Sequence, residues 1–228
     1  MKVLVACEES QIVTKAFRLA GHEAYSCDLE APSGGHPEWH FQGDVLEYLK
    51  WSYWDLVIAH PPYTFLTVAN TYLNRGCSKY TIQEAREHQA KAQAFFMEFV
   101  SAPAERIAIE NPIGVMNTRY RKPDQIIQPY EYGHPESKKT CLWLKNLPKL
   151  VPTGEIAEVK RYRCTKCGSV FDAQLGVYGC CKSPAKPIWE NQTPSGQNKL
   201  RPSPDRAKIR SKTYEGVANA MAMQWSIY

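Results

Sequence analysis

The sequence predicts an α/β fold built on a mainly parallel sheet, followed by a small module that contains several cysteines. Short apolar runs alternate with stretches of helical periodicity, which is the βαβ pattern of a parallel sheet. Polar residues directly follow most of the apolar runs. Near residue 150 the composition changes, and cysteine and basic residues become frequent. These observations predict one α/β core with a small satellite module.

The first half of the chain supplies the alternating elements. The apolar, β-branched run at 2–7 predicts a strand buried on both faces. Residues 11–20 have helical spacing, and Gly21 ends that helix. The Pro/Ser/Gly-rich stretch 31–37 predicts a loop. Further strands are predicted at 22–29, 54–59 and 106–110, and further helices from about 43, at 81–100 and at 214–225.

Polar side chains occur where the predicted strands end. In a parallel sheet, ligands bind beyond the carboxyl ends of the strands, which meet at one edge. The residues in question are Glu8, Asp28, Asp44, His60 and Glu110. The sequence therefore predicts a ligand site at this edge of the sheet.

Four cysteines in the last third predict a metal site. Cys164 and Cys167 are separated by two residues, and Cys180 and Cys181 follow in a basic stretch. Two such pairs can supply the four thiolates of a structural zinc site. The adjacency of Cys180 and Cys181 is unusual, so either both or one of them would bind. Free or redox-active cysteines are the alternative.

Composition and charge limit the functional classes. At 228 residues with 43% hydrophobic residues, the chain is long enough for one full core. No apolar run approaches the roughly 18 residues of a membrane span, and the first apolar run is too short for a signal peptide, so we expect no membrane association and a cytoplasmic location. Residues 1–150 carry 16 Lys and Arg against 17 Asp and Glu, whereas 151–228 carry 12 against 6. That basic excess fits a phosphate backbone and a solvated surface equally well.

The order of short motifs along nearly the whole chain resembles small phage and prophage DNA cytosine-C5 methyltransferases. The matching motifs are Ala6-Cys7-Glu8-Glu9-Ser10, Cys27-Asp28, Gly43-Asp44-Val45, His60-Pro61-Pro62, Ile109-Glu110-Asn111-Pro112 and Ser211-Lys212-Thr213-Tyr214. The resemblance implies a Rossmann-like class I methyltransferase fold, S-adenosyl-L-methionine as the cofactor and DNA as the partner.

The resemblance also implies roles for individual residues. Glu8 and Ser10 would hold the methionine part of the cofactor, Asp28 the ribose hydroxyls and Asp44 the adenine amine. Glu110 would read cytosine through the ring N3 and the N4 amine, and a carboxyl group in a closed pocket tends to have the raised pKa that this role needs. The first loop departs from many relatives, because Gln11 stands where a glycine is common.

A second departure concerns the reaction itself. In C5 methyltransferases a cysteine nucleophile follows the proline, whereas this chain has Tyr63. A phenol has a pKa of about 10, so it does not form the reversible cytosine adduct as a thiolate does. His60-Pro61-Pro62-Tyr63 instead resembles the Asp/Asn/Ser-Pro-Pro-Tyr motif of amino-methyltransferases, in which acceptors hold the amine and the aromatic ring stacks on a flipped base.

The sequence thus predicts methyl transfer to cytosine N4 in DNA. Alternatives are a C5 methyltransferase with another nucleophile, an RNA methyltransferase, and a DNA-binding protein without activity. We expect a catalytic core at 1–150, a basic cysteine-rich module for DNA target recognition at 151–200, and a segment at 201–228 that returns to the core. The residues predicted to contact phosphates are Lys199, Arg201, Arg206, Lys208 and Arg210.

Overall fold

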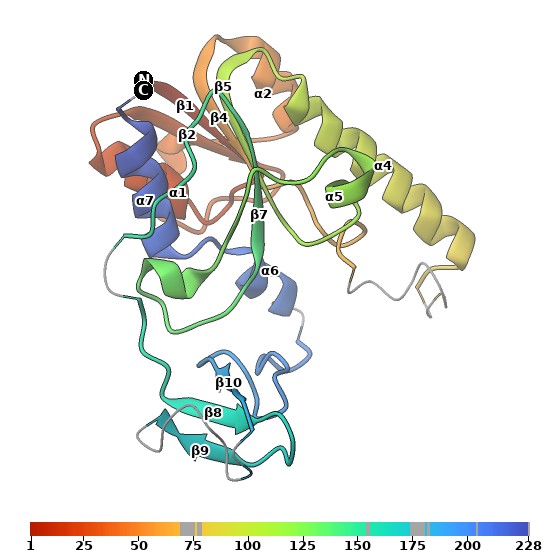
Figure 1. The fold of residues 1–228 in the computed structure, drawn as a ribbon. Coiled ribbons are helices and arrows are strands. Elements are labelled where there is room, and N and C mark those ends of the chain that lie inside the picture. The colour runs from red at the N-terminus through yellow and green to blue at the C-terminus, as the bar shows by residue number, and fades with distance from the viewer. Residues whose placement is uncertain are drawn as a thin grey trace. The chain divides into compact units, whose positions relative to one another are not determined.

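The apolar runs of the sequence form one seven-stranded sheet in the order β3-β2-β1-β4-β5-β7-β6 (Figure 1). The computed structural model describes residues 1–68, 76, 79–153, 156–173, 181, 183–203 and 205–227, and the structural statements below refer to them. The strands are β1 (Lys2–Ala6), β2 (Glu23–Asp28), β3 (His40–Gln42), β4 (Trp54–Ala59), β5 (Ala104–Pro112), β6 (Gln125–Ile127) and β7 (Thr140–Lys145).

The chain divides into two units. Unit 1 comprises Met1–Ile127, Lys139–Val151 and Ala218–Tyr228, and it contains the seven-stranded sheet. Unit 2 comprises Gln128–Lys138 and Pro152–Val217. Each unit is described separately below.

The sheet of unit 1 is mainly parallel, as the sequence predicts. Strands β3, β2, β1, β4 and β5 pair in parallel, and β7 pairs antiparallel with β5 and β6. This confirms the predicted Rossmann-like α/β fold class. Strand β5 is longer than the predicted 106–110, because Ala104 pairs with Trp54 of β4 and because Asn111 and Pro112 pair with β7. The sequence pattern did not predict β6 and β7.

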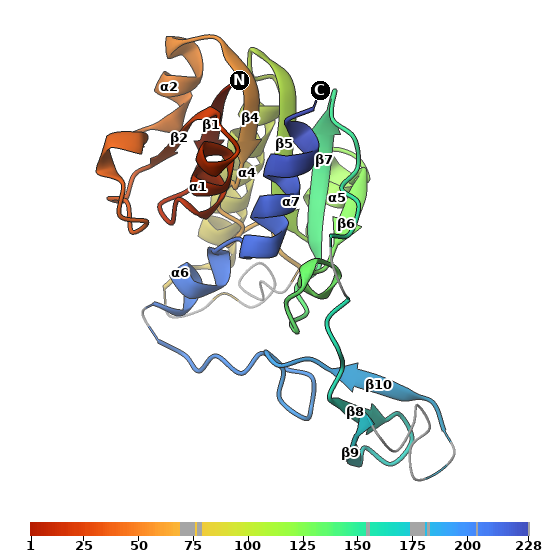
Figure 2. The ribbon, with the colours of Figure 1, turned by 90° about the vertical axis from the view of Figure 1, so that its left-hand side faces the viewer.

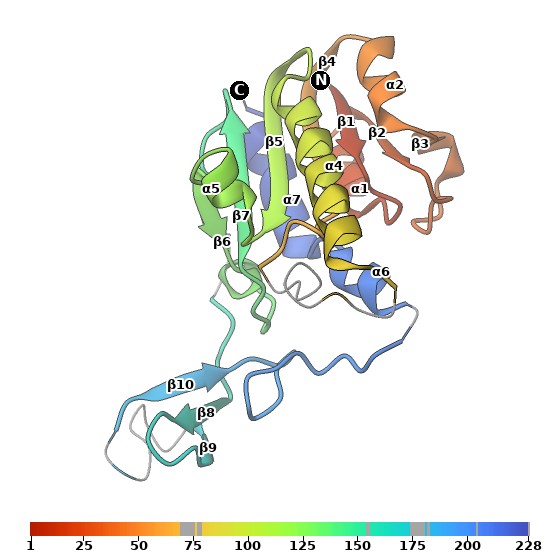
Figure 3. The same ribbon diagram turned by 90° about the vertical axis from the view of Figure 1, so that its right-hand side faces the viewer.

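Helices cover both faces of this sheet. Figure 2 shows α1 and α7 in front of one face, and Figure 3 shows α4 and α5 in front of the other. Phe96 and Phe99 of α4 are fully buried and share a cluster with Leu4 and Val57 of the central strands. None of the helices in the described ranges is long and apolar enough to cross a membrane. The helices are α1 (Ile12–Leu19), α2 (Val45–Trp51), α4 (Ile82–Val100), α5 (Met116–Arg119), α6 (Arg206–Ser211) and α7 (Glu215–Trp225), with 3₁₀ turns at Pro37–Trp39 and Pro129–Tyr132.

Unit 2 contains a three-stranded antiparallel sheet in the order β10-β8-β9. Its strands are β8 (Arg161–Cys164), β9 (Val170–Asp172) and β10 (Ala185–Ile188). After β10, the Trp189 ring stacks on Tyr130 at 4.1 Å between centroids. The Asn191 side chain exchanges two hydrogen bonds with the backbone of Ser137. Ring stacking and polar contacts therefore connect the parts of this unit.

Candidate functional site

The strand ends at which the sequence predicts a ligand site lie along one edge of the sheet in unit 1. Because β3, β2, β1, β4 and β5 are parallel, their carboxyl ends share one edge of the sheet. Strand pairing sets Ala6 beside both Cys27 and Ala59, and Ala59 beside Ile109. The residues that follow these positions are therefore neighbours, although they are far apart in the sequence. All residues predicted to bind cofactor or base lie in this unit.

His60 and Glu110 form a buried pair at the centre of this edge. His60 Nδ1 lies 2.7 Å from Glu110 Oε2, and each side chain is 9% exposed. The backbone of His60 donates to the carbonyl of Ala6, which extends the pairing of β4 with β1. The other ring nitrogen, Nε2, is buried and has no hydrogen-bond partner within the described ranges. With an ionised Glu110, Nδ1 carries the hydrogen and Nε2 is an acceptor.

The turn after His60 is fixed by the residue after Glu110. The Asn111 side-chain amide, which is buried, donates to the Pro61 carbonyl at 2.7 Å. The backbone of Val115 donates to the carbonyl of Leu66 at 2.8 Å. Gly114 allows this close approach, because a Cβ there would lie 2.1 Å from the Leu66 carbonyl oxygen. The segment that carries Pro62 and the half-buried Tyr63 is thus held against the end of β5.

Glu8 binds the first turn of helix α1. Its carboxylate accepts hydrogen bonds from the backbone of Val13 at 2.6 Å and of Thr14 at 3.2 Å, and from the Thr14 hydroxyl at 2.7 Å. Gln11, the N-cap residue, makes no side-chain capping bond, so Glu8 satisfies these orphan donors instead. Burial raises the pKa of Glu8, while the nearby His60 and the hydrogen bonds act in the opposite direction. Glu8 therefore positions the loop between β1 and α1.

This loop holds two non-glycine residues in the left-handed region. Cys7 has φ 60° and Gln11 has φ 57°. Such conformations are costly for residues with a Cβ, and they concentrate at functional sites. The Gln11 side chain offsets the cost of its backbone conformation by forming hydrogen bonds with both the N–H and the carbonyl of His36, in the predicted 31–37 loop. Gln11 thus adopts the backbone conformation that a glycine in this place favours. Ser10, also buried, lies between these strained positions.

Asp28 and Asp44 lie at the ends of the outer strands. Asp28 closes β2, its Oδ1 accepts from the backbone of Glu30, and burial raises its pKa. Asp44 follows β3, is exposed, and caps α2 through a bond from the backbone of Leu46 to its Oδ1. Burial raises the pKa of the Cys27 thiol, and the carboxylates of Asp28 and Asp44 raise it further, to about 12. The carboxylates of Asp28 and Asp44 therefore both lie near Cys7 and Cys27, at the ends of β1, β2 and β3.

The cysteines described in unit 1 are not activated nucleophiles. Burial raises the pKa of the Cys7 thiol, and the carboxylates of Asp28 and Asp44 raise it further. Burial also raises the pKa of Cys141, whose thiol accepts from the Asn117 amide. A reactive cysteine needs a lowered pKa and partial exposure. Cys77 lies outside the described residues.

Three of the four predicted metal ligands come together in unit 2. The Sγ atoms of Cys164, Cys167 and Cys181 all lie within 4.8 Å of one another. Cys180 lies outside the described residues. The basic residues predicted to contact phosphates also belong to unit 2. Lys199, Arg201 and Arg210 are exposed, whereas Arg206 and Lys208 are partly buried.

Sequence reasoning alone did not find three features of the site. The hydrogen bond between His60 and Glu110 joins residues that are 50 positions apart. The roles of Thr14 and Asn111 as partners of Glu8 and Pro61 also depend on tertiary contacts. The only sequence signal was the position of His60 and Glu110 at the ends of strands that proved to be neighbours.

Comparisons with known proteins find similarity among solved structures. No protein-family profile matches the chain, and no similar sequence is found among curated proteins. The chain is similar to the crystal structure of a mutant DNMT2 from Spodoptera frugiperda, with 13% sequence identity and a TM-score of 0.38. The similar region covers 68% of this chain and 54% of the other, so the chain spans about half the length of that protein.

Proposed function

We propose that the protein is an S-adenosyl-L-methionine-dependent DNA methyltransferase that modifies the N4 amine of cytosine. One observation carries the proposal. His60 Nε2 is a buried nitrogen without a partner among the described residues, and Glu110 orients the ring through Nδ1. A buried acceptor of this kind is costly unless a ligand group satisfies it. An exocyclic amine, which has hydrogens to donate, is a suitable ligand.

The edge of the sheet fits the proposed cofactor by its donor and acceptor chemistry. Asp28 would accept from the ribose hydroxyls and Asp44 from the adenine amine, since carboxylates are acceptors. Ser10 and the strained backbone around it would hold the methionine part, and Glu8 would keep that loop in place through α1. When bound, the cofactor supplies an electrophilic methyl group on a positively charged sulfur. The acidic side chains of this edge favour such a charge.

His60 and Glu110 would act on the amine in sequence. His60 Nε2 first accepts one amine hydrogen, which turns the nitrogen lone pair away from the ring plane and toward the methyl group. The new N–C bond would form as the bond between the methyl group and the sulfur breaks, with that electron pair left on the sulfur, which becomes neutral. The amine would lose its proton to Nε2, and the imidazole would become an imidazolium ion. The Glu110 carboxylate, 2.7 Å from Nδ1, stabilises that charge. Glu110 thus acts through His60, as an ionised carboxylate.

The neighbouring turn supports amine chemistry over attack at C5. Tyr63 occupies the place of the C5 nucleophile, and the thiols of Cys7, Cys27 and Cys141 have raised pKa values. Methylation of an amine needs no covalent adduct, so a thiolate is unnecessary. The Pro61 carbonyl, fixed by Asn111, would offer its second lone pair to the amine, and the Tyr63 ring would stack on the base.

A nucleic acid substrate is supported by the charge of the last third of the chain. Residues 151–228 carry 12 Lys and Arg against 6 Asp and Glu. Three of the five basic residues predicted to contact phosphates are exposed. Phosphate contacts of this type make binding weaken steeply with added salt. DNA is the substrate that we propose, and RNA is the competing outcome of the test.

The test is mass spectrometry of nucleosides after incubation of DNA, and separately of RNA, with the protein and deuteriomethyl-labelled cofactor. We expect label in N4-methyldeoxycytidine. His60→Ala should lower the rate by about 10²–10⁴-fold, because the amine loses its proton acceptor. The matched control is His36→Ala, a partly exposed histidine of the 31–37 loop whose ring contacts Glu38 and Trp39 rather than the His60–Glu110 pair. Label in 5-methyldeoxycytidine, or only in RNA, would refute the proposal.

A further inference from the structure

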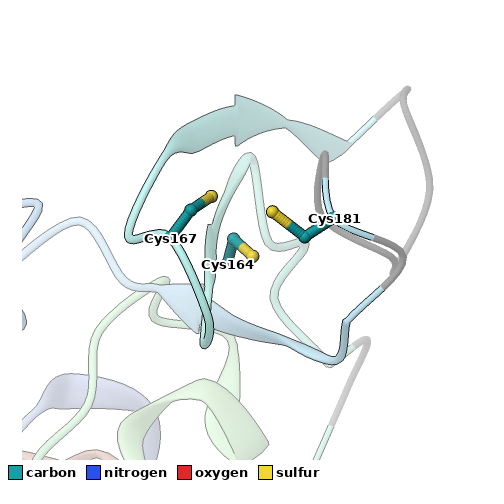
Figure 4. Close-up of side chains that lie close together, drawn as sticks. All are labelled: Cys164, Cys167 and Cys181. Carbon is teal, nitrogen blue, oxygen red and sulfur yellow. The ribbon is translucent and has the colours of Figure 1, made fainter.

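Three thiols separated by up to 17 positions in the sequence meet at one point of unit 2. Figure 4 shows the side chains of Cys164, Cys167 and Cys181 lying close together. Their Sγ atoms all lie within 4.8 Å of one another, and none of the three forms a disulfide. Cys164 is buried and Cys167 is exposed. The cluster belongs to a different unit from the His60–Glu110 site.

A tight turn after β8 brings the first two thiols together. Cys164 ends the strand, and the backbone of Gly168 donates to its carbonyl at 3.1 Å. The backbone of Cys164 in turn donates to the carbonyl of Ser169 at 2.9 Å. Gly168 has φ 77°, a conformation that glycine adopts without strain, so the chain reverses immediately after Cys167. Such a turn directs two thiols, separated by two residues, to the same side.

Strand pairing brings the third thiol. Ala185, the first residue of β10, pairs with Cys164 in the antiparallel register. The backbone and the hydroxyl of Thr165 both donate to the carbonyl of Pro184, at 3.1 and 2.6 Å. Cys181 lies just before this paired segment and is therefore held opposite the turn. Backbone contacts thus fix Cys164 and the turn that carries Cys167, and they hold Pro184 and Ala185, close in sequence to Cys181, against the same turn.

The spacing of the sulfur atoms suits one tetrahedral metal ion. With Zn–S bonds of about 2.3 Å, a tetrahedral site places its sulfur atoms roughly 3.8 Å apart, within the separation found here. Thiolates are soft ligands that favour zinc over the hard cations calcium and magnesium. A disulfide would use two of the three thiols and leave the third unpaired, so it explains the convergence less well.

The sheet around the cluster has little else to stabilise it. In β8, β9 and β10 the buried residues are Cys164 and Ile188, and most of the others are partly or fully exposed. Small modules with so little buried apolar surface commonly need a metal or disulfides to fold. We therefore propose that Cys164, Cys167 and Cys181 bind one Zn²⁺ as thiolates, with a fourth ligand closing the site, and that this ion is structural.

Metal analysis of the full-length protein tests the proposal. Protein prepared with zinc in the medium should contain one equivalent, and Cys164→Ser, Cys167→Ser and Cys181→Ser should each lose most of it. Cys141→Ala is the matched control, because Cys141 is a buried thiol of unit 1 and should leave the zinc content unchanged. Zinc retained in the triple serine variant, or lost equally in Cys141→Ala, would refute the site.

A second measurement avoids variants that fail to fold. Replacement of zinc by Co²⁺ in the unaltered protein should give the intense visible and near-ultraviolet absorption of a tetrahedral cobalt–thiolate centre. Added zinc should abolish this spectrum, because zinc binds such sites more tightly than cobalt. A weak octahedral spectrum, or none with the thiols shown to be reduced, would overturn the proposal. Neither measurement depends on methyl transfer, so failure of the proposed function would leave this result intact.

Discussion

The two units of the chain differ in what stabilises them. In unit 1 the central strands β1 and β4 are almost entirely buried, and aromatic residues of α4 pack against them. In unit 2 the strands β8, β9 and β10 are short, only two of their residues are buried, and three thiols lie close to them. Burial of apolar surface is therefore sufficient for the first fold and insufficient for the second.

The same difference separates the chemical roles that we propose. His60 and Glu110 lie at the ends of buried strands, where packing holds a reacting group within a fraction of an ångström. The basic residues proposed for phosphate contacts lie in unit 2, where a wide, solvated surface is appropriate. Catalysis would thus depend on the core of unit 1, and nucleic acid affinity on a metal held by unit 2.

Removal of the metal should have the largest effect and should affect only unit 2. A structural zinc ion contributes on the order of 10 kcal/mol to the folding of a small module, so chelation should unfold β8, β9 and β10. Unit 1 should be unchanged because its core contains none of the three ligands. Amide hydrogen exchange, read by peptide mass spectrometry before and after chelation, should show lost protection in 160–173 and 183–189 and none lost in β1, β4 and β5.

Two outcomes of this exchange experiment would contradict the proposed difference between the units. If protection is lost equally in both units, they fold as one cooperative unit. If protection is unchanged in both, the thiols do not stabilise the sheet. Restoration by added Zn²⁺, but not by Mg²⁺, is the control for damage caused by the chelator, since Mg²⁺ prefers oxygen ligands.

The sequence predicted unit 1 better than unit 2 for the same physical reason. Buried parallel strands are continuous apolar runs, so β1 and β4 were predicted within one residue of their observed bounds. The strands of unit 2 read Arg161-Tyr162-Arg163-Cys164 and Ala185-Lys186-Pro187-Ile188, which have no such pattern. Only the cysteine spacing pointed to a structure there.

The proximity of the candidate site residues was predictable from the sequence, and their contacts were less so. Parallel topology brings the strand ends together, and so the five polar residues at those ends could be identified from the sequence. The hydrogen bond of Glu8 to α1 and that of His60 to Glu110 depend on side-chain directions, which the sequence does not specify. Those contacts give Glu8 a positioning role that the motif alone did not indicate.

Truncation of a core aromatic residue should have the next largest effect, confined to unit 1. Phe99 is fully buried and packs edge-on against Phe95 at 5.1 Å between centroids. Phe99→Ala should lower the free energy of unfolding by about 3–5 kcal/mol, from lost burial and the cavity left behind. Urea denaturation followed by circular dichroism measures this change.

The matched control for this variant is Met97→Ala on the same helix. Met97 is 39% exposed, so its truncation should change the free energy of unfolding by only about 0.5 kcal/mol. Zinc content should be normal in both variants. If Phe99→Ala also loses zinc under conditions where unit 1 remains folded, the two units are coupled more closely than their separate cores suggest.

The smallest effect should come from Asp44, whose role as a helix cap must be separated from its proposed contact with the cofactor. Asp44→Ala removes the bond from the Leu46 backbone and should cost about 1 kcal/mol of stability. Asp44→Ser restores a capping oxygen and should recover most of that loss.

The serine is too short to replace the carboxylate toward adenine, so calorimetric titration with S-adenosyl-L-methionine should show similarly weakened binding in both variants. If Asp44→Ser restores cofactor affinity along with stability, Asp44 acts only by capping α2. If affinity stays low while stability recovers, the carboxylate contacts the ligand, and this exposed polar residue of unit 1 serves binding far more than folding.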